Sequence, residues 1–332
     1  MQKEKQPEKE RIVMSGMRPT GPLHLGHWEG ALRNWLRLQE ECECYFSIAD
    51  WHALTSEYAD PSLIRDHSRA VLLDWLSVGI DPERAVVFRQ SAIKEIPELF
   101  LLFSMIAPLG RLERVPTFKE QKVQIKDRDL NTFGFLGYPL LQTIDIIVVG
   151  GNTVPVGEDQ VYHIELAREM VRRFNLFYGE VFQEPMELLT PQSRLPGLDG
   201  RKMSKSYGNV INLSDDAEAV QKKIMPMKTD IRRQRRSDPG VPEDCPVFAF
   251  HRSFSSAAEV EEVDAGCRSA GIGCIDCKRI LVKNLNHFLD PVRDRRARFE
   301  NMDVEDILAP GITRARDRAN RTMQTVRRHV KL

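Results

Sequence analysis

Short apolar runs alternate with longer patterns of helical spacing over more than half of the chain, from Ile12 to about Thr190. The runs predicted as strands are Ile12–Met14, Tyr45–Ile48, Ala85–Phe88, Val154–Val156 and Leu188–Leu189. The longest patterns predicted as helices are Trp28–Leu38, Leu63–Leu76, Ile96–Met105 and Val161–Phe174. Such alternation is typical of the α/β class, with a doubly wound, mostly parallel sheet that binds ligands in a crevice at its strand ends.

The pattern changes after Pro196, where strand-like runs cease and most of the remaining chain has helical spacing. The stretch Lys222–Arg236 and the part from Arg293 onward are strongly basic. We therefore expect a domain break near residues 190–210. The predicted division is a mobile tail over residues 1–10, an α/β domain over 11–200 with a helical insertion around 95–145, and a helical domain over 201–332.

Composition narrows the class of protein. The 332 residues carry 48 Lys+Arg and 48 Asp+Glu, so the formal net charge is zero and any contact with nucleic acid must depend on local basic patches. The start, MQKEKQPEKER, is charged and lacks the apolar core of a signal peptide or anchor. No apolar run approaches the length of a membrane span. These features predict a cytoplasmic protein without a membrane partner, in which disulfides are not expected.

One stretch, MSGMRPTGPLHLGHWEGA from Met14 to Ala31, predicts an anion-binding turn. It reads as the end of a buried strand, a turn rich in glycine and proline, and the start of a helix. Main-chain N–H groups and the helix dipole favour phosphate at such a turn. His24 and His27 lie three residues apart, on one face of the predicted helix, so both could donate to the same phosphate group. The alternative is a strand–turn–helix unit whose histidines are ordinary surface residues.

The segment His24-Leu25-Gly26-His27 resembles the HIGH signature of class I aminoacyl-tRNA synthetases, although some nucleotidylyltransferases share this element. A second motif, Lys202-Met203-Ser204-Lys205-Ser206, matches the KMSKS loop of the same class letter for letter. The two motifs in this order favour a synthetase. The resemblance implies a Rossmann-type catalytic domain, followed by the KMSKS loop and a helical domain that binds the tRNA anticodon.

Further segments indicate which amino acid a class I synthetase with this sequence would use. Val154–Gln160 (VPVGEDQ), Gly110–Arg114 (GRLER) and the following Phe118-Lys119 resemble tryptophanyl-tRNA synthetases. The spacing of Tyr138, Gln142 and Asp145 occurs in tyrosyl enzymes too, so it supports both branches. In tryptophan enzymes the acid that matches Asp145 accepts the indole N–H, which is a donor only and needs an acceptor. A helix-surface carboxylate is the alternative for Asp145.

The resemblance implies a reaction and its site residues. Tryptophan would attack the α-phosphorus of ATP, and the adenylate would then pass its tryptophanyl group to the 3′ end of tRNA(Trp). Catalytic roles fall to His24, His27, Lys202 and Lys205, with Mg²⁺ assisting. Residues implied in ATP binding are Arg18, Pro19, Thr20, Gly26, His27, Gly157, Glu158, Asp159, Leu195, Lys202, Met203, Ser204, Lys205 and Ser206. Residues implied in tryptophan binding are Met14, Tyr138, Gln142, Asp145, Val154, Val156 and Gln160. Arg18 departs from the glutamine common in bacterial relatives.

Four late cysteines follow the pattern C-x21-C-x6-C-x2-C, namely Cys245, Cys267, Cys274 and Cys277. Four thiolates can complete a tetrahedral sulfur site. The pattern resembles a motif in bacterial tryptophanyl-tRNA synthetases that bind a four-iron four-sulfur cluster. Zinc is the alternative metal, and four unrelated packing cysteines are the alternative without metal, as we expect for Cys42 and Cys44.

Basic residues follow this motif, and we expect Lys278, Arg279 and Lys283 to bring positive charge near an anticodon base. The expected partners are thus L-tryptophan, ATP, tRNA(Trp) and, by resemblance, a second copy in a homodimer. The alternatives are a tyrosyl-tRNA synthetase, a nucleotidylyltransferase, and a non-charging synthetase paralogue that acts as regulator or scaffold.

Overall fold

The computed structural model describes residues 11–124, 128–189 and 195–332. The predicted tail over residues 1–10 therefore lies outside the described residues. Within them, a five-stranded sheet has the order β3-β2-β1-β4-β5, and every pair is parallel. Its strands are β1 (Ile12–Met17), β2 (Glu43–Ile48), β3 (Val86–Arg89), β4 (Thr153–Val156) and β5 (Met186–Leu189). The predicted fold class, a doubly wound parallel sheet followed by a helical region, is confirmed.

The strand order reverses between β1 and β4, because the chain first builds β1, β2 and β3 on one side and returns to β1's other side with β4. Ligands bind at such a switch point, beyond the carboxyl ends of the strands. The helix after β1 begins with α1 (Leu25–His27), continues as a π-helical turn (Trp28–Leu32) and ends as α2 (Arg33–Glu41). Two further helices, α3 (Asp50–Glu57) and α4 (Ile64–Val78), connect β2 to β3.

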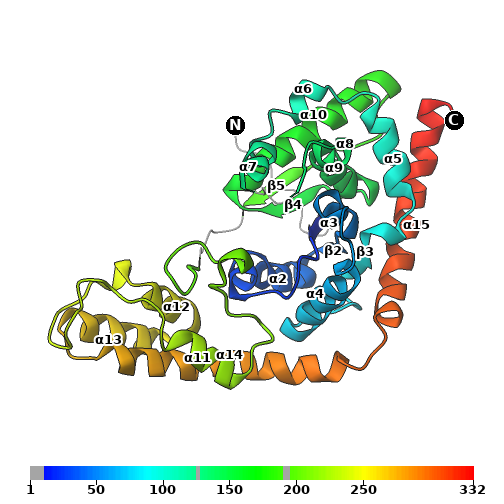
Figure 1. Ribbon diagram of the computed structural model, residues 1–332. Helices are drawn as coiled ribbons and strands as arrows, with labels where there is room; N and C mark the ends of the chain where they lie inside the picture. Colours follow the sequence, from blue (N-terminus) through cyan, green and yellow to red (C-terminus); the bar gives the residue numbers. More distant parts are fainter. Residues whose placement is uncertain (1–10, 125–127, 190–194) are drawn as a thin grey trace.

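The connection from β3 to β4 is almost entirely helical. It contains a short 3-10 turn (Gln90–Ala92) and then the helices α5 (Glu95–Ser104), α6 (Leu109–Leu112), α7 (Pro116–Gln124), α8 (Phe133–Leu136) and α9 (Tyr138–Val148). Helix α10 (Val161–Tyr178) follows β4 through another 3-10 turn (Glu158–Gln160). Figure 1 shows α5 to α10 gathered on one side of the molecule, away from the C-terminal helices α11 to α14.

The C-terminal region forms a helical arm that extends away from the sheet and then returns to it (Figure 1). The arm contains α11 (Ala217–Ile224), α12 (Pro246–Phe254), α13 (Ala257–Arg268) and α14 (Cys274–Phe299). Helix α15 (Val304–Val330) then runs back along β3. Its buried Ala315, Ala319, Met323 and Val326 belong to the same hydrophobic core as α5, α9 and α10.

Helix α14 packs on α4 through a second core, to which Leu281, Leu285, Leu289 and Val292 contribute together with Val71 and Trp75. The helical region is therefore fixed to the α/β part at both α14 and α15. None of the helices in the described ranges is long and apolar enough to cross a membrane.

Candidate active site

The turn after β1 has its two histidines locked by main-chain hydrogen bonds. His24 Nδ1 accepts from the N–H of Gly26, and His27 Nδ1 accepts from the N–H of His24, both at 3.1 Å. In a neutral imidazole with an accepting Nδ1, the proton lies on Nε2. The two rings lie 3.8 Å apart, centroid to centroid. The predicted pair is thus brought together, with both Nε2–H groups as the remaining donors.

Both histidines are neutral at physiological pH. Burial, which disfavours the charged imidazolium, and the nearby Lys205 ammonium together lower the pKa of His24 to about 4. Burial likewise lowers the pKa of His27, and the adjacent His24 ring and the Lys205 ammonium act in the same direction. An anion at this turn would therefore meet neutral N–H donors rather than two cations.

The second signature packs directly on this turn. Lys205 Nζ donates to the carbonyl oxygen of Gly21 at 2.8 Å. Burial lowers the pKa of Lys205 to about 8, while the Asp74 carboxylate acts in the opposite direction. The N–H of Leu25 donates to the carbonyl of Ile211, and the N–H of Leu213 donates to that of Leu23, each at 2.9 Å. The chain that follows the loop is thus paired with the histidine turn.

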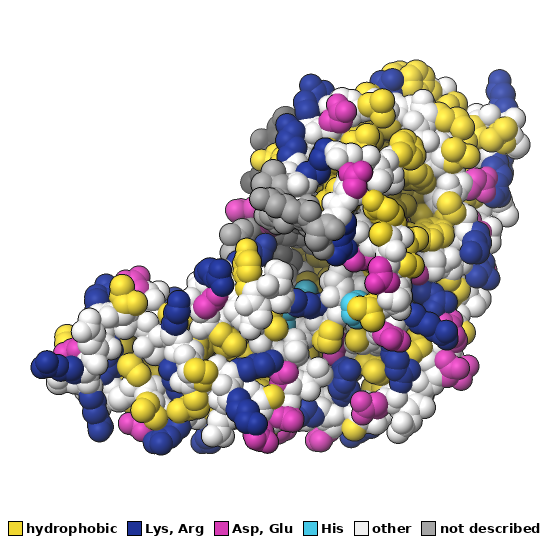
Figure 2. Space-filling view, in the orientation of Figure 1, with side chains coloured by type: hydrophobic (Ala, Val, Ile, Leu, Met, Phe, Trp, Pro, Cys, Tyr) yellow, Lys and Arg dark blue, Asp and Glu magenta, His cyan; other side chains and the backbone are white. Residues whose placement is uncertain are grey.

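The rest of the loop is braced by Asn209. Its amide oxygen accepts from the N–H of Ser204, and its amide nitrogen donates to Asp199 Oδ1 and to the carbonyl of Lys202. Met203 is buried, whereas the Lys202 side chain is exposed. The structure therefore brings Lys205 to the histidines and leaves Lys202 at the surface. Figure 2 shows the surface hollowed between the α/β part and the helical arm, with histidine and basic side chains in the hollow.

A cavity of about 430 Å³ opens at the carboxyl ends of β1 and β4. All seven residues that the sequence assigns to tryptophan line this cavity, together with Arg18 and Gly157. They are Met14 from β1, Tyr138, Gln142 and Asp145 from α9, Val154 and Val156 from β4, and Gln160 before α10. The arrangement gives an apolar slot with polar groups at a few points, which is the usual form of a small-molecule site.

Asp145 is held from two sides by residues that the sequence did not single out. Gln90 Nε2 donates to both carboxylate oxygens, at 2.7 Å and 2.9 Å. The imidazole Nε2 of His52 lies 2.9 Å from Asp145 Oδ2. The carboxyl group is buried, yet Asp145 and His52 both line the cavity. Asp145 is therefore not a helix-surface acid.

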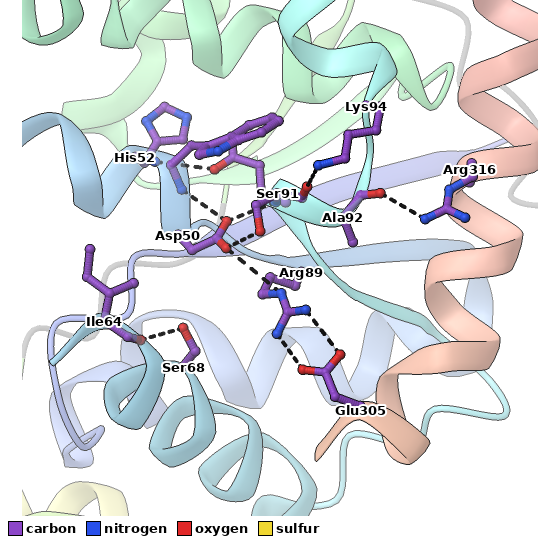
Figure 3. Close-up of polar contacts among 12 residues, drawn as sticks. Asp50, His52, Ile64, Ser68, Arg89, Ser91, Ala92, Lys94, Glu305 and Arg316 are labelled. Carbon is purple, nitrogen blue, oxygen red and sulfur yellow. Dashed lines mark hydrogen bonds and ion pairs between the residues drawn. The ribbon is translucent and has the colours of Figure 1, made fainter. Parts of the chain in front are cut away.

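A chain of polar contacts holds the first residue of α3, the helix that carries His52 (Figure 3). Asp50, at the first position of α3, accepts hydrogen bonds from the main-chain N–H and the hydroxyl of Ser91. Arg89 lies 4.0 Å from Asp50 and forms a two-pronged ion pair with Glu305 of α15, at 2.6 Å and 3.0 Å. These contacts fix the start of α3, and thereby place His52 against Asp145.

A second polar group lies across the cavity. Thr117 Oγ1 lies 2.6 Å from the hydroxyl oxygen of Tyr138 and 3.0 Å from His163 Nε2. Burial lowers the pKa of His163 to about 4 and raises that of Tyr138. Thr117 and His163 were not expected from the sequence. Gln90 directly follows β3, and His52 lies in the first turn of α3, soon after β2. The rule that ligands bind at strand ends could therefore have pointed to these two residues.

The residues expected to bind ATP are brought together only in part. Arg18 lines the cavity and donates to the hydroxyl of Ser56, while its Nε has no partner among the described residues. Burial lowers the pKa of its guanidinium, and Glu57 acts in the opposite direction. Pro19 and Thr20 line a neighbouring cavity of about 400 Å³. The carboxylates of Glu158 and Asp159 are exposed outside both cavities, and Leu195 is buried in the same core as Met203.

The four late cysteines meet at one small cavity of about 20 Å³ in the helical arm. Cys245 precedes α12, Cys267 lies in the last turn of α13, and Cys274 and Cys277 lie in the first turn of α14. Burial, together with the neighbouring Cys245, Cys267 and Cys274, raises the pKa of Cys277 to about 12. Arg233 lies beside them, with Nη1 at 3.7 Å from Cys267 Sγ. In the parts of the chain that are described, no group of three or more His, Cys, Asp or Glu has the arrangement of a metal site.

One expectation about charge in this arm is wrong. Lys278 is buried, and its Nζ donates to the carbonyl oxygen of Met225 at 2.8 Å. Its charge therefore serves the packing of α14 and does not face a nucleic acid. Arg279 and Lys283 are exposed, and Arg279 pairs with Asp276.

Comparison with known proteins agrees with this geometry. Residues 5–290 match the family model described as tRNA synthetases class I (W and Y). The tryptophan–tRNA ligase of Thermotoga maritima is 51% identical over 327 residues, covering 96% of this chain and 99% of that protein. The tryptophan–tRNA ligase of Aquifex aeolicus is 43% identical, with 96% and 99% covered.

Solved structures agree as well. Tryptophanyl-tRNA synthetase from Campylobacter jejuni, complexed with ADP and tryptophan, superposes with a TM-score of 0.88 at 30% identity, covering 97% of this chain and all of that chain. Tyrosyl-tRNA synthetase from Archaeoglobus fulgidus, complexed with L-tyrosine, superposes with a TM-score of 0.67 at 26% identity, with 87% and 91% covered.

Proposed function

The chain belongs to the class I tRNA synthetases for tryptophan, and from this membership we propose how its residues divide the work. It is a tryptophan–tRNA ligase, which activates L-tryptophan with ATP and transfers the tryptophanyl group to tRNA. The observation that supports the assignment of roles is the common cavity of the seven expected tryptophan residues. Arg18, which precedes the histidine turn in the chain, lines the same cavity.

In this proposal the indole lies in the slot between Met14, Val154 and Val156. Asp145 accepts its N–H, because Gln90 and His52 hold the carboxylate in place and an indole nitrogen can only donate. The amino group of tryptophan faces the polar side of the cavity, where Tyr138, Gln142 and Gln160 supply oxygen acceptors. Arg18 at the cavity wall supplies the positive charge nearest to the carboxylate and α-phosphate.

The chemical step needs no protein nucleophile. The tryptophan carboxylate attacks the α-phosphorus of ATP, and pyrophosphate leaves. His24 and His27 donate from Nε2 to the phosphates, while Lys205, with Lys202 if the loop closes, offsets the charge that develops on the leaving pyrophosphate. Mg²⁺ usually binds through substrate phosphates and water, and here it would enter with ATP and neutralise part of their charge. Gly157, Glu158 and Asp159 remain candidates for the ribose.

The test is amino-acid-dependent ATP–pyrophosphate exchange with all twenty amino acids. Tryptophan should support exchange and tyrosine should not. Exchange with tyrosine would assign the other branch, and the absence of exchange with every amino acid would leave a non-charging paralogue. Charging of tRNA(Trp) transcript then tests the second step.

We also propose that Cys245, Cys267, Cys274 and Cys277 hold a four-iron four-sulfur cluster, with zinc as the alternative. The residue types fit, since four cysteines line one small cavity and Arg233 places a positive charge beside them. The thiol side chains would have to turn toward a common centre to bind either group. The proposed role is structural: the group would fix Arg279 and Lys283, on the exposed side of α14, for contact with the tRNA anticodon.

A second copy of the chain is the proposed partner of an exposed apolar surface, consistent with the homodimer that the family resemblance implies. Leu101, Met105, Leu109 and Phe133 are each more than half exposed. Figure 2 shows hydrophobic side chains gathered in this region, over α5, α8 and α9. Light scattering tests the dimer, and Met105→Glu should shift it toward monomer. We retain the division into residues 11–200 and 201–332, and a cytoplasmic location, as parts of the same proposal.

A further inference from the structure

A buried carboxylate connects the helical arm to the histidine turn. Asp74 lies in α4, its side chain is fully buried, and its Oδ2 accepts the main-chain N–H of Leu23 at 2.7 Å. Its other oxygen accepts from Arg296 Nη1 in the last turn of α14. One side chain thus holds both the residue before His24 and the arm.

The histidine turn depends on this contact for its position. The N–H of Leu23 goes to Asp74, while its carbonyl accepts from Leu213 and the N–H of Leu25 donates to Ile211. His24 is therefore held by partners on either side of it in the chain. Among the hydrogen bonds that hold Leu23 and Leu25 within the described residues, the Asp74 contact comes from a side chain and the others from the backbone, so a substitution at Asp74 can act on Leu23 without changing the backbone pairing.

Asp74 can hold the turn only while its charge is compensated. A carboxylate without solvent contact is costly unless it is paired and hydrogen-bonded. Arg296 supplies the ion pair, and the Lys205 ammonium adds a weaker attraction. Arg296, which belongs to the helical arm, thus supplies the positive charge that favours the ionised form of Asp74. The Asp74 carboxylate in turn accepts the N–H of Leu23.

We propose that Asp74 and Arg296 are positioning residues for adenylate formation, through which the helical arm supports the geometry of the His24–His27 turn. This inference rests on the proposed function, since it concerns the same activation step. Neither residue lines the tryptophan cavity, so their effect should fall on the turnover number and not on tryptophan binding.

The neighbouring Arg295 provides a matched control. It lies on the same turn of α14, and its Nε donates to the carbonyl of Ser77, on the same helix α4, at 2.6 Å. Arg295→Gln thus removes a contact between the same two helices without touching Asp74. If Arg296 only docks α14 on α4, the two substitutions should behave alike.

The experiment is tryptophan-dependent ATP–pyrophosphate exchange with the full-length enzyme. Arg296→Gln should lower kcat by about 10- to 100-fold with the tryptophan KM nearly unchanged, because a small displacement of catalytic donors is costly to the chemical step. Arg296→Lys, which keeps the charge, should recover most of kcat, and Arg295→Gln should stay near the wild type. Equal kcat values for Arg296→Gln and Arg295→Gln in folded proteins would overturn the proposal.

A double-mutant cycle keeps the inference testable if Arg296→Gln folds poorly. Asp74→Asn preserves the size of the side chain and an oxygen acceptor for Leu23, and it removes the charge. The double variant Asp74→Asn/Arg296→Gln should be no slower than the worse single variant, because both changes break one unit, whereas multiplied losses would contradict it. A wild-type enzyme without tryptophan-dependent exchange would instead refute the proposed function.

Discussion

Lys205 lies with its Nζ 2.8 Å from the carbonyl oxygen of Gly21, in the turn that leads to His24. Its ammonium group is already directed at the place where the phosphates of ATP are proposed to bind. Lys202, three residues earlier, is exposed, and no side-chain hydrogen bond to the turn is seen for it among the described residues. The two lysines of the signature therefore have different starting positions.

Lys205→Ala should lower the rate of adenylate formation by about 10²- to 10³-fold, because a preformed donor is lost where charge develops in the transition state. Tryptophan affinity should change little. Lys202→Ala is the natural comparison and should cost less, unless loop closure brings Lys202 to the phosphates. Single-turnover adenylate formation measures both, and a near-wild-type rate for Lys205→Ala would remove this lysine from the mechanism.

The pH dependence should report the same lysine. Its pKa is lowered to about 8 by burial, so in the free enzyme the ammonium is lost as the pH rises through that value. We expect kcat/KM for ATP to fall as the pH rises through about 8, because kcat/KM follows the ionisation of the free enzyme. Lys205→Arg keeps its charge at this pH, so its profile should lack the fall. An identical fall in the arginine variant would assign it to another group.

Asp145→Asn should weaken the use of tryptophan and leave the KM for ATP nearly intact. An amide can present N–H to the indole N–H, and loss of a charged hydrogen-bond partner in a buried site costs about 1.5–3 kcal/mol, or roughly 10- to 100-fold in kcat/KM. Steady-state exchange at varied tryptophan concentration measures this change. Unchanged kinetics for tryptophan would show that Asp145 is not the indole acceptor.

The sequence predicted the sheet well because buried parallel strands are short, apolar and bounded by turn residues. Each of the five predicted runs coincides with an observed strand within a few residues. The residues around the cavity could be predicted because they belong to local sequence patterns. These patterns are the stretch Met14–Ala31, the segment Val154–Gln160 and the spacing of Tyr138, Gln142 and Asp145. Their meeting at one cavity follows from the strand order, which local patterns do not specify.

The contacts between polar residues far apart in the chain could not be predicted from the sequence, even where the position of one residue after a strand marks it as a candidate. Gln90 and His52 hold Asp145 only because β2 and β3 end beside α9 in space. Lys278 follows a cysteine motif and reads as a surface cation, but its partner is the carbonyl of Met225, far away in the chain. Asp74 likewise lies within an apolar helical pattern, and nothing local marks its contacts with Leu23 and Arg296.

Docking of α15 on the sheet leads to a stability prediction. A Cβ atom at Gly311 would lie 1.9 Å from the carbonyl oxygen of Val87 in β3, so the helix could not keep its place. Gly311→Ala should lower the free energy of unfolding by about 1–3 kcal/mol or more, as overpacking does. Gly134→Ala in α8 is the control, since its Cβ would meet open space. Chemical denaturation of both variants measures the difference, and equal stability would contradict close packing of α15 on β3.

The cysteine cavity gives the last prediction. Protein purified without oxygen should be brown and contain about four irons and four sulfides per chain, the stoichiometry of such clusters. Cys274→Ser and Cys277→Ser should each lose the colour, because both thiols lie in the first turn of α14 at the common cavity. Cys42→Ser is the control, since Cys42 lies outside this cavity and should leave the metal content unchanged.

Adenylate formation should survive loss of the cluster, because the cysteines lie in the helical arm and not at the histidine turn. The charging of tRNA(Trp) should suffer instead, since the first turns of α14 carry the exposed Arg279 and Lys283. Measuring exchange and charging on the same preparations separates the two effects. Colourless protein that contains one zinc per chain would show that the metal is zinc and not an iron–sulfur cluster, and the proposed structural role would stand. Anaerobically prepared protein that is free of metal and fully active in charging would refute the metal site, and the four cysteines would then be packing residues.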